Sequence, residues 1–309
     1  MCPVLVLALV VVAVTVGAAP YELPGTLTLP DGAGPFPAVV LVHGSGPNDR
    51  DETVGKTKLF ADLAAGLADH GIASLRYDKR TYAYGDQLTN DLTLDDEVIT
   101  DAVAAVHVLQ ARPEIARVIV VGHSLGGMLA PEIATRAGHV AAVAMLAAPA
   151  RPPLVILRDQ LRYLGAPREL RGQVEAALAV VELAALGDDP TLQVMGMPLS
   201  YWRDWEAHDG VATARALDVP LLVLQGDRDY QVTREDFGIW KRTLGRHAAY
   251  ALLAGDNHGF FRGRGRPSPH DYADEVHVDP RVVDRLVELV RRPDVARGVR
   301  SKGCVVRCS

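Results

Sequence analysis

The most constraining feature of this sequence is a buried-strand pattern that runs directly into a Gly-x-Ser-x-Gly motif. Positions 118–121 hold four β-branched residues without a polar break, which is typical of a strand covered on both faces. Gly122, Ser124 and Gly126 follow, and residues 125–137 have a helical pattern, with a kink predicted at Pro131. In such a strand–turn–helix the serine lies at the apex of a sharp turn with its hydroxyl exposed. The context therefore predicts a reactive serine at position 124.

Size and charge limit the classes of protein that this chain can belong to. It has 309 residues, of which 49% are apolar, and a formal net charge of −6. This length and apolar content suffice for one large domain with its own core. The negative charge, and the lack of a basic stripe in the body of the chain, argue against a nucleic-acid partner.

The three cysteines predict no metal site. Cys2, Cys304 and Cys308 lie at the two ends of the chain, away from any histidine cluster with metal-ligand spacing. A pairing of Cys304 with Cys308 would need an oxidising compartment, and two free thiols in the tail are the default expectation.

The apolar N-terminal segment, residues 1–18, has two open interpretations. Its apolar run at residues 4–16 is too short to span a bilayer but matches the length of a signal-peptide core, followed by small residues. No Lys or Arg precedes the run, as a signal would normally require. Residues 10–16 could equally be the first strand of a sheet. No stable membrane span is predicted, and the localisation stays open between cytoplasmic and secreted or periplasmic.

Strand and helix patterns alternate along most of the chain. This alternation predicts an α/β fold with a mostly parallel central sheet and helices on both faces. Buried strands are predicted at residues 36–42, 72–77, 118–121, 140–146, 219–225 and 248–253, and helices at residues 59–70, 98–109, 125–137 and 280–289. The core is assigned to residues 19–150 and 218–292, and residues 293–309 are predicted to form a basic, disordered tail.

Residues 151–217 interrupt this alternation with helical patterns and no buried strand. A helical insertion between two strands of a sheet predicts a cap over the site that the sheet carries. Its aromatic residues Tyr201, Trp202 and Trp205 either line an apolar acyl pocket or form the core that holds the cap in place.

Three reactive groups follow the ends of successive predicted strands. A serine hydroxyl such as that of Ser124 needs a base, and the imidazole of His258 in the loop after residue 253 can serve. The imidazole in turn needs an acceptor on its other nitrogen. We predict Asp229 as this acceptor, with Asp227 directed to solvent or paired with Arg228. The order Ser, Asp, His is the one used by the α/β-hydrolase fold.

Two further features bear on the site. The glycine-punctuated loop at residues 43–47 follows a buried strand and is either a plain turn or half of an oxyanion hole, with the Ser45 N–H as donor. The charged residues 48–52 either order this loop through Arg–carboxylate pairs or form a solvated turn. Among the other histidines, His277 is the only serious rival of His258 by position.

Longer motifs make the chain similar to a known family. The sequence resembles the serine α/β-hydrolases, and within them a group of bacterial carboxylesterases. The likeness rests on segments at residues 43–51 (His-Gly-Ser-Gly-Pro-Asn-Asp-Arg-Asp), 75–80, 122–127 (Gly-His-Ser-Leu-Gly-Gly), 224–232, 257–258 and 277–280. Gly259 departs from the family pattern, which usually has a bulky apolar residue there.

The resemblance implies a mechanism and a substrate class. It implies a catalytic triad of Ser124, Asp229 and His258, and an oxyanion hole formed by the N–H groups of Ser45 and Leu125. It further implies a serine hydrolase that acts on small-molecule esters with short acyl chains, without a metal or organic cofactor. A serine peptidase or thioesterase on the same fold is the alternative, and a catalytically silent binding protein is a third possibility.

Overall fold

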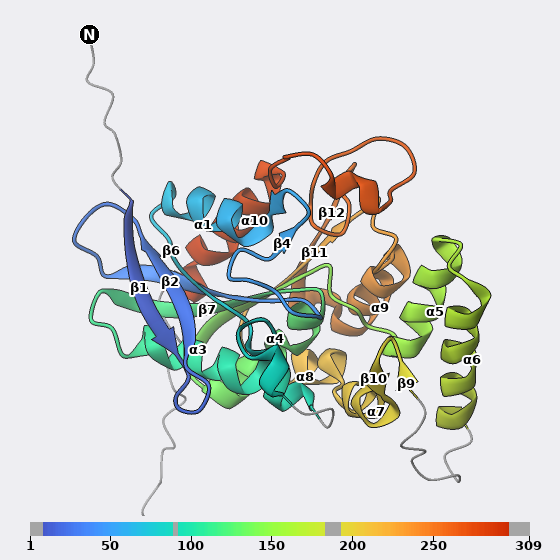
Figure 1. Ribbon diagram of the computed structural model, residues 1–309. Coiled ribbons are helices and arrows are strands. Elements are labelled where there is room, and N and C mark those ends of the chain that lie inside the picture. Colours follow the sequence, from blue (N-terminus) through green and yellow to red (C-terminus); the bar gives the residue numbers. More distant parts are fainter. Residues whose placement is uncertain (1–8, 89–91, 183–192, 297–309) are drawn as a thin grey trace, which may run out of the picture.

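The computed structural model describes residues 9–88, 92–182 and 193–296. Eight strands form one sheet in the order β1-β2-β6-β3-β7-β8-β11-β12 (Figure 1). The six strands from β6 to β12 are parallel, whereas β2 runs antiparallel to β6, and β1 antiparallel to β2. The strands are β1 Val10–Val16, β2 Leu23–Leu29, β3 Phe36–Val42, β6 Ala73–Tyr77, β7 Ile115–His123, β8 Val140–Leu146, β11 Leu221–Gly226 and β12 Ala248–Leu253.

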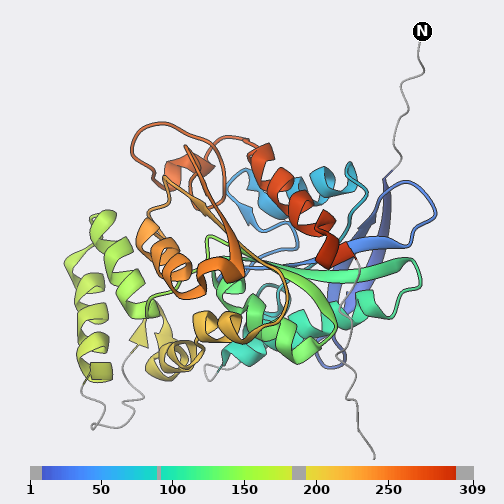
Figure 2. The same ribbon diagram turned by 180° about the vertical axis from the view of Figure 1, so that it is seen from behind.

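Helices cover both faces of this sheet, as the alternation of patterns predicts (Figures 1 and 2). The helices α1 (Leu59–Ala68) and α10 (Pro280–Arg291) pack on one face, and α3 (Thr100–Gln110), α4 (Leu125–Ala137) and α9 (Arg234–Leu244) on the other. Within β3 and β7, Val40 and Val120 face the α3–α4 core, while their neighbours Val39 and Ile119 face the α1–α10 core. Both side-chain directions are buried, which explains the unbroken apolar runs.

The two ends of the described chain refine the sequence predictions. Strand β1 occupies Val10–Val16 and pairs with β2 at the edge of the sheet. At the other end the predicted tail starts too early, because Pro293–Ala296 form helix α11 and Val295 is fully buried against the α1–α10 core. Cys2, Cys304 and Cys308 lie outside the described residues. No helix in residues 9–88, 92–182 or 193–296 has the length and apolarity that crossing a membrane requires.

A helical segment connects β8 to β11, where the sequence predicts an insertion. It comprises α5 (Pro153–Tyr163), α6 (Arg168–Glu182), α7 (Leu199–Ala207) and α8 (Gly210–Ala216), with a ribbon of two-residue strands, β9 (Gln193–Val194) and β10 (Met197–Pro198). We refer to it as the α5–α8 segment. In Figure 1, α5, α6 and α7 lie on the side of the molecule opposite β1, whereas α8 packs against α4 and α9.

The turn from β7 into α4 depends on two glycines. A Cβ atom on Gly122 would lie 2.1 Å from the carbonyl oxygen of Gly126, and one on Gly126 would lie 2.3 Å from that of Val42. Backbone therefore contacts backbone where β7 ends, α4 begins and β3 ends. Helix α4 continues through Pro131 to Ala137, so the proline is accommodated inside the helix.

This packing predicts opposite effects for two glycine substitutions. Gly126→Ala is expected to lower the midpoint of thermal unfolding by several degrees, because overpacking against a backbone costs about 1–3 kcal/mol or more. The matched change Gly172→Ala, in α6 where a Cβ would meet nothing within 4 Å, is expected to raise it slightly, since Ala favours a helix by about 0.5–1 kcal/mol over Gly. Differential scanning calorimetry measures both, and equal midpoints would contradict the analysis.

Candidate active site

Ser124 occupies the apex of the turn between β7 and α4 in a strained conformation. Its φ is 52° and its ψ is −121°, a combination that few non-glycine residues adopt. The Ser124 N–H donates a hydrogen bond of 2.8 Å to the carbonyl of Leu146, at the end of the neighbouring strand β8. The next residue, Leu125, is the first of α4, where a backbone N–H has no acceptor within the helix. The serine is thus presented beside a free backbone donor.

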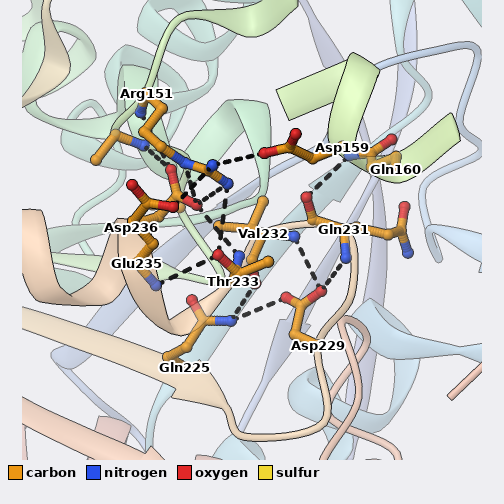
Figure 3. A network of polar contacts seen from close by, with 12 residues as sticks. Arg151, Asp159, Gln160, Gln225, Asp229, Gln231, Val232, Thr233, Glu235 and Asp236 are labelled. Atoms are coloured by element: carbon orange, nitrogen blue, oxygen red, sulfur yellow. Dashed lines mark hydrogen bonds and ion pairs between the residues drawn. The ribbon is translucent and has the colours of Figure 1, made fainter. Parts of the chain in front are cut away.

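Asp229 and His258 form a buried pair in the loops after β11 and β12. The distance between His258 Nδ1 and Asp229 Oδ2 is 2.6 Å, and the carboxylate is fully buried. As Figure 3 shows, Asp229 also accepts hydrogen bonds from the Gln225 side chain (2.9 Å) and from the N–H groups of Gln231 (2.7 Å) and Val232 (3.0 Å). Four donors therefore fix this carboxylate, which in turn orients the imidazole.

The turn that carries His258 is built on Asn257. Its side-chain oxygen accepts hydrogen bonds from the N–H groups of Gly259 (3.1 Å) and Phe261 (3.0 Å), and Phe260 has a φ of 60°. A Cβ atom on Gly259 would lie 2.5 Å from the ring of Phe261. The departure from the family pattern at position 259 thus has a steric reason, because the phenylalanine ring fills the space of a side chain there.

The alternative acid and histidine lie elsewhere. Asp227 accepts a hydrogen bond from the Gly255 N–H (2.7 Å) and pairs with Arg234 (3.2 Å). Of the two outcomes predicted for Asp227, the pair with Arg228 is therefore wrong. Arg228 pairs with Asp271 instead. The side chain of His277 is 77% exposed and contacts Asp62, and it does not line the cavities described below.

The loop after β3 presents Ser45 beside Ser124. The Gly44 N–H donates 2.6 Å to the Glu52 carboxylate, and the Asn48 amide donates 3.2 Å to each of the carbonyls of Gly44, Ser45 and Gly46. Within the described residues, the Ser45 N–H has no acceptor. A backbone N–H without an acceptor, in a residue that lines the same cavity as Ser124, is a candidate donor for an oxyanion.

The charged residues after this loop order it rather than forming a solvated turn. The Arg50 guanidinium holds both oxygens of Asp78, at 3.0 and 2.7 Å, and Asp51 pairs with Arg76. Glu52 turns inward and is buried, with a φ of 50°. Arg–carboxylate pairing, one of the two interpretations of residues 48–52, therefore describes this segment.

Glu52 sets the electrostatics behind the serine. Its carboxylate lies 3.1 Å from Nδ1 of His123, whose Nε2 donates 2.9 Å to the His258 carbonyl. Burial lowers the pKa of His123, but the Glu52 carboxylate, the His258 carbonyl and Asp229 together raise it above its ordinary value. For His43, burial dominates and lowers the pKa to about 4. The two histidines that flank the site thus have pKa values shifted in opposite directions.

Two cavities meet at Ser124 and His258. The larger, of about 560 Å³, extends under the α5–α8 segment, and the smaller, of about 150 Å³, lies toward Gly259, Phe261 and Tyr272. The larger is lined mainly by apolar side chains, including Ile156, Leu157, Met197, Tyr201, Trp202 and Trp205. Such a volume and lining are typical of small-molecule sites. No group of three or more His, Cys, Asp or Glu side chains suited to a metal ion occurs in the part of the chain that the structure describes.

The aromatic residues of α7 have both of the roles left open by the sequence. The rings of Trp202 and Trp205 are stacked at 5.7 Å between centroids, and Tyr201 meets both edge-on. All three also line the larger cavity. These three residues therefore both pack against one another within the α5–α8 segment and line the larger cavity.

Sequence reasoning missed two buried charges beside the site. Lys79 reaches the carbonyls of the Ser45 loop, and Glu97 lines the larger cavity. Lys79 lies in residues 75–80, one of the segments on which the family resemblance rests. That resemblance was the one signal in the sequence that pointed to Lys79. Glu97 follows two other acids before a helix and gave no signal of its own.

Comparison with known proteins identifies the family. The model of the alpha/beta hydrolase family matches residues 39–242. The chain belongs to this family. The fold class and the family resemblance inferred from the sequence are thereby confirmed.

A relative of known activity is similar over most of this chain. Esterase EstD of Thermotoga maritima is 46% identical over 267 residues, which are 85% of this chain and 64% of that protein. The chain thus spans less than two thirds of that relative's length.

Solved structures share the fold at low identity. Est1E from Butyrivibrio proteoclasticus has a TM-score of 0.62 at 18% identity, covering 89% of this chain and 96% of its own. The Pyrococcus furiosus esterase Pf2001 has a TM-score of 0.58 at 15% identity, covering 92% and 91%. A proline iminopeptidase of Mycobacterium smegmatis has a TM-score of 0.57 at 17% identity, covering 93% and 100%. The alpha/beta hydrolase fold thus does not by itself choose between an ester and a peptide substrate.

The loop before His258 carries a carboxyl group that we predict to govern how stability depends on pH. Burial and the neighbouring Asp279 raise the pKa of Asp256 to about 7, against partial compensation by Arg281, whose Nη2 is 3.1 Å away. In the unfolded chain this carboxyl has a pKa of about 3.9. The folded state therefore binds one proton more between these values, and its stability falls as pH rises from about 4 to about 7.

Asp256→Asn is expected to remove this slope and to raise the unfolding midpoint most at pH 8. Thermal melts at pH 5, 6, 7 and 8 measure it. Asp31→Asn, at an exposed position, serves as the control and should leave the slope unchanged. The same slope in Asp256→Asn as in the wild type would contradict the prediction.

Proposed function

We propose that this protein hydrolyses carboxylic esters through an acyl-serine intermediate. The observation that carries the proposal is the convergence of Ser124 and His258 on one apolar cavity, with the imidazole held by the buried Asp229 carboxylate. The 46% identity to a protein named as an esterase supports ester hydrolysis over other acyl transfers. In this proposal Ser124 is the nucleophile, His258 the general base and Asp229 the group that fixes the imidazole.

The first half of the reaction forms the acyl-enzyme. Ser124 Oγ attacks the ester carbonyl carbon while His258 Nε2 accepts its proton, because Nδ1 is engaged by Asp229. The carbonyl oxygen becomes an oxyanion that accepts hydrogen bonds from the Ser45 and Leu125 N–H groups. The tetrahedral intermediate collapses, His258 returns the proton to the departing alkoxide, and the alcohol leaves.

The second half releases the acid. Water attacks the acyl carbon with His258 again taking a proton, and a second tetrahedral oxyanion forms in the same hole. Its collapse breaks the bond to Ser124 Oγ, which regains the proton from His258. Each oxyanion donor contributes about 3 kcal/mol to the transition state in enzymes of this kind.

In this proposal the α5–α8 segment acts as a cap that shapes the substrate site. Its residues Ile156, Leu157 and Trp202 supply part of the apolar wall of the larger cavity. A wall of this kind favours an acyl group that is apolar. We propose esters with short acyl chains as substrates, as the family resemblance implies.

Ser124→Ala is expected to lower ester turnover by at least about 10⁴-fold, because the variant lacks the hydroxyl that forms the acyl-enzyme in the proposed mechanism. Hydrolysis of p-nitrophenyl butyrate measures it, and a fluorophosphonate probe should label the wild type but not the variant. Ser200→Ala, at an exposed position in α7, is the matched control. Wild-type turnover in Ser124→Ala would refute the mechanism. A folded wild-type protein that takes no label would favour a silent binding protein.

The leaving group is tested with one acyl group presented as an ester, a thioester and an aminoacyl amide. The ester is expected to have the highest kcat/KM, and preference for the amide would assign a peptidase instead.

The acyl-chain length is tested with a series of p-nitrophenyl esters. As the chain lengthens from acetyl, kcat/KM should first rise, because each buried methylene contributes about 0.8 kcal/mol, and should then fall for long chains. A maximum at long chains would contradict the short-chain proposal.

A further inference from the structure

A buried ammonium group lies directly behind the Ser45 loop. Lys79 follows strand β6, and only 2% of its side chain is exposed. Its Nζ donates 2.8 Å to the carbonyl of Gly44 and 3.1 Å to that of Gly46, and its third partner is the Glu97 carboxylate. All three N–H bonds of the ammonium therefore have acceptors.

Glu97 connects this ammonium to the wall of the larger cavity. The carboxylate is 3% exposed and lies on the π-helical turn Asp95–Ile99 that precedes α3. One of its oxygens pairs with Lys79, and the other accepts a hydrogen bond of 2.7 Å from the hydroxyl of Tyr201 in α7. A continuous buried polar chain thus joins the Ser45 loop to the α5–α8 segment.

A contribution to folding stability does not by itself explain why the buried Lys79–Glu97 pair is present. Removing two charges from water costs several kcal/mol per ion, and well-packed apolar residues of similar volume are often as stabilising. The pair also lies against the site, since Glu97 and Tyr201 line the same cavity as Ser45 and Ser124. The alternative is that the pair holds groups of the site in position.

The role follows from the peptide that Lys79 holds. The carbonyl of Gly44 and the N–H of Ser45 belong to one planar trans peptide, so they point in opposite directions. An ammonium that fixes the Gly44 carbonyl therefore also fixes the direction of the Ser45 N–H, and Ser45 lines the same cavity as Ser124. Glu52 holds the preceding peptide through the Gly44 N–H, so both peptides are anchored.

We propose that Lys79 is a positioning residue for the oxyanion hole, with Glu97 and Tyr201 holding its ammonium in place. The proposal rests on the proposed function, because it assigns the Ser45 N–H as a donor to the reaction's oxyanion. Besides orientation, the ammonium polarises the Gly44 carbonyl, which makes the N–H of the same peptide a stronger donor. Asn48 shares the Gly44 carbonyl, so loss of Lys79 weakens the arrangement without abolishing it.

The test removes both charges at once, so that no unpaired ion is left buried. The double variant Lys79→Met/Glu97→Gln is expected to lower kcat for p-nitrophenyl butyrate by about 10-fold, which is less than the roughly 10²-fold loss on complete removal of one oxyanion donor. KM should change by less than about twofold, because the donor acts mainly on the transition state. Lys241→Met, at an exposed position in α9, is the matched control and should retain wild-type kinetics.

A pair of inhibitors separates positioning from a general structural effect. A trifluoromethyl ketone forms a tetrahedral oxyanion adduct with an active-site serine, whereas the corresponding carbinol does not. In the double variant the ketone's inhibition constant should rise in parallel with the loss of kcat/KM, and the carbinol's should stay unchanged. Equal weakening of both inhibitors would overturn the proposal, and so would a wild-type kcat in a folded variant.

A milder substitution covers the case in which the double variant does not fold. Tyr201→Phe keeps the Lys79–Glu97 pair and both carbonyl contacts of Lys79, and removes only the hydroxyl that holds the Glu97 carboxylate. A smaller loss of kcat is therefore expected, with the same split between the two inhibitors. An unchanged kcat in this variant, if the double variant does not fold, would overturn the proposal. Failure of the proposed function would be recognised separately, because the wild-type protein would then turn over no ester and take no serine-directed label.

Discussion

The close backbone contact between the start of α4 and the end of β3 is the constraint on which the site depends. Because Gly126 has no side chain, the first turn of α4 approaches the carbonyls of Val42 and His43. This places the loop that follows β3, with Ser45, beside the turn that carries Ser124. Ser124 and the proposed oxyanion donors are therefore brought together by main-chain packing, independently of any charged contact.

Buried polar groups then hold each loop of the site from behind. Asp229 is fixed by four donors, the Gly44 N–H by Glu52, and the Gly44 carbonyl by Lys79. Each of these groups loses hydration on folding. Asp229 and Lys79 replace the lost water with several hydrogen bonds each, whereas Glu52 has the Gly44 N–H and the nearby His123 ring. These contacts restrain loops that have no regular secondary structure, and electrostatic preorganisation requires such restraint.

The sequence predicted those features whose cause is local or periodic. Alternating patterns gave the parallel sheet, and strand–turn–helix context singled out Ser124. Other features depend on contacts that no pattern encodes. Asp227 meets Arg234 rather than Arg228, and Lys79 meets a carboxylate 18 positions away because α3 packs beside β6. Val295 reads as part of a polar tail, yet it is buried because α11 folds back onto the α1–α10 core.

The polar chain through Lys79 makes the two halves of the proposed site dependent on one another. Tyr201 supplies part of the apolar wall with its ring, while its hydroxyl contacts Glu97 and through it the loop that bears Ser45. If the proposed roles hold, a substrate group that displaces α7 would strain the same peptide that would bind the oxyanion. In an enzyme of this design, the fit of the substrate in the cavity and the stabilisation of the transition state are mechanically linked. Selectivity would then appear in kcat as well as in KM.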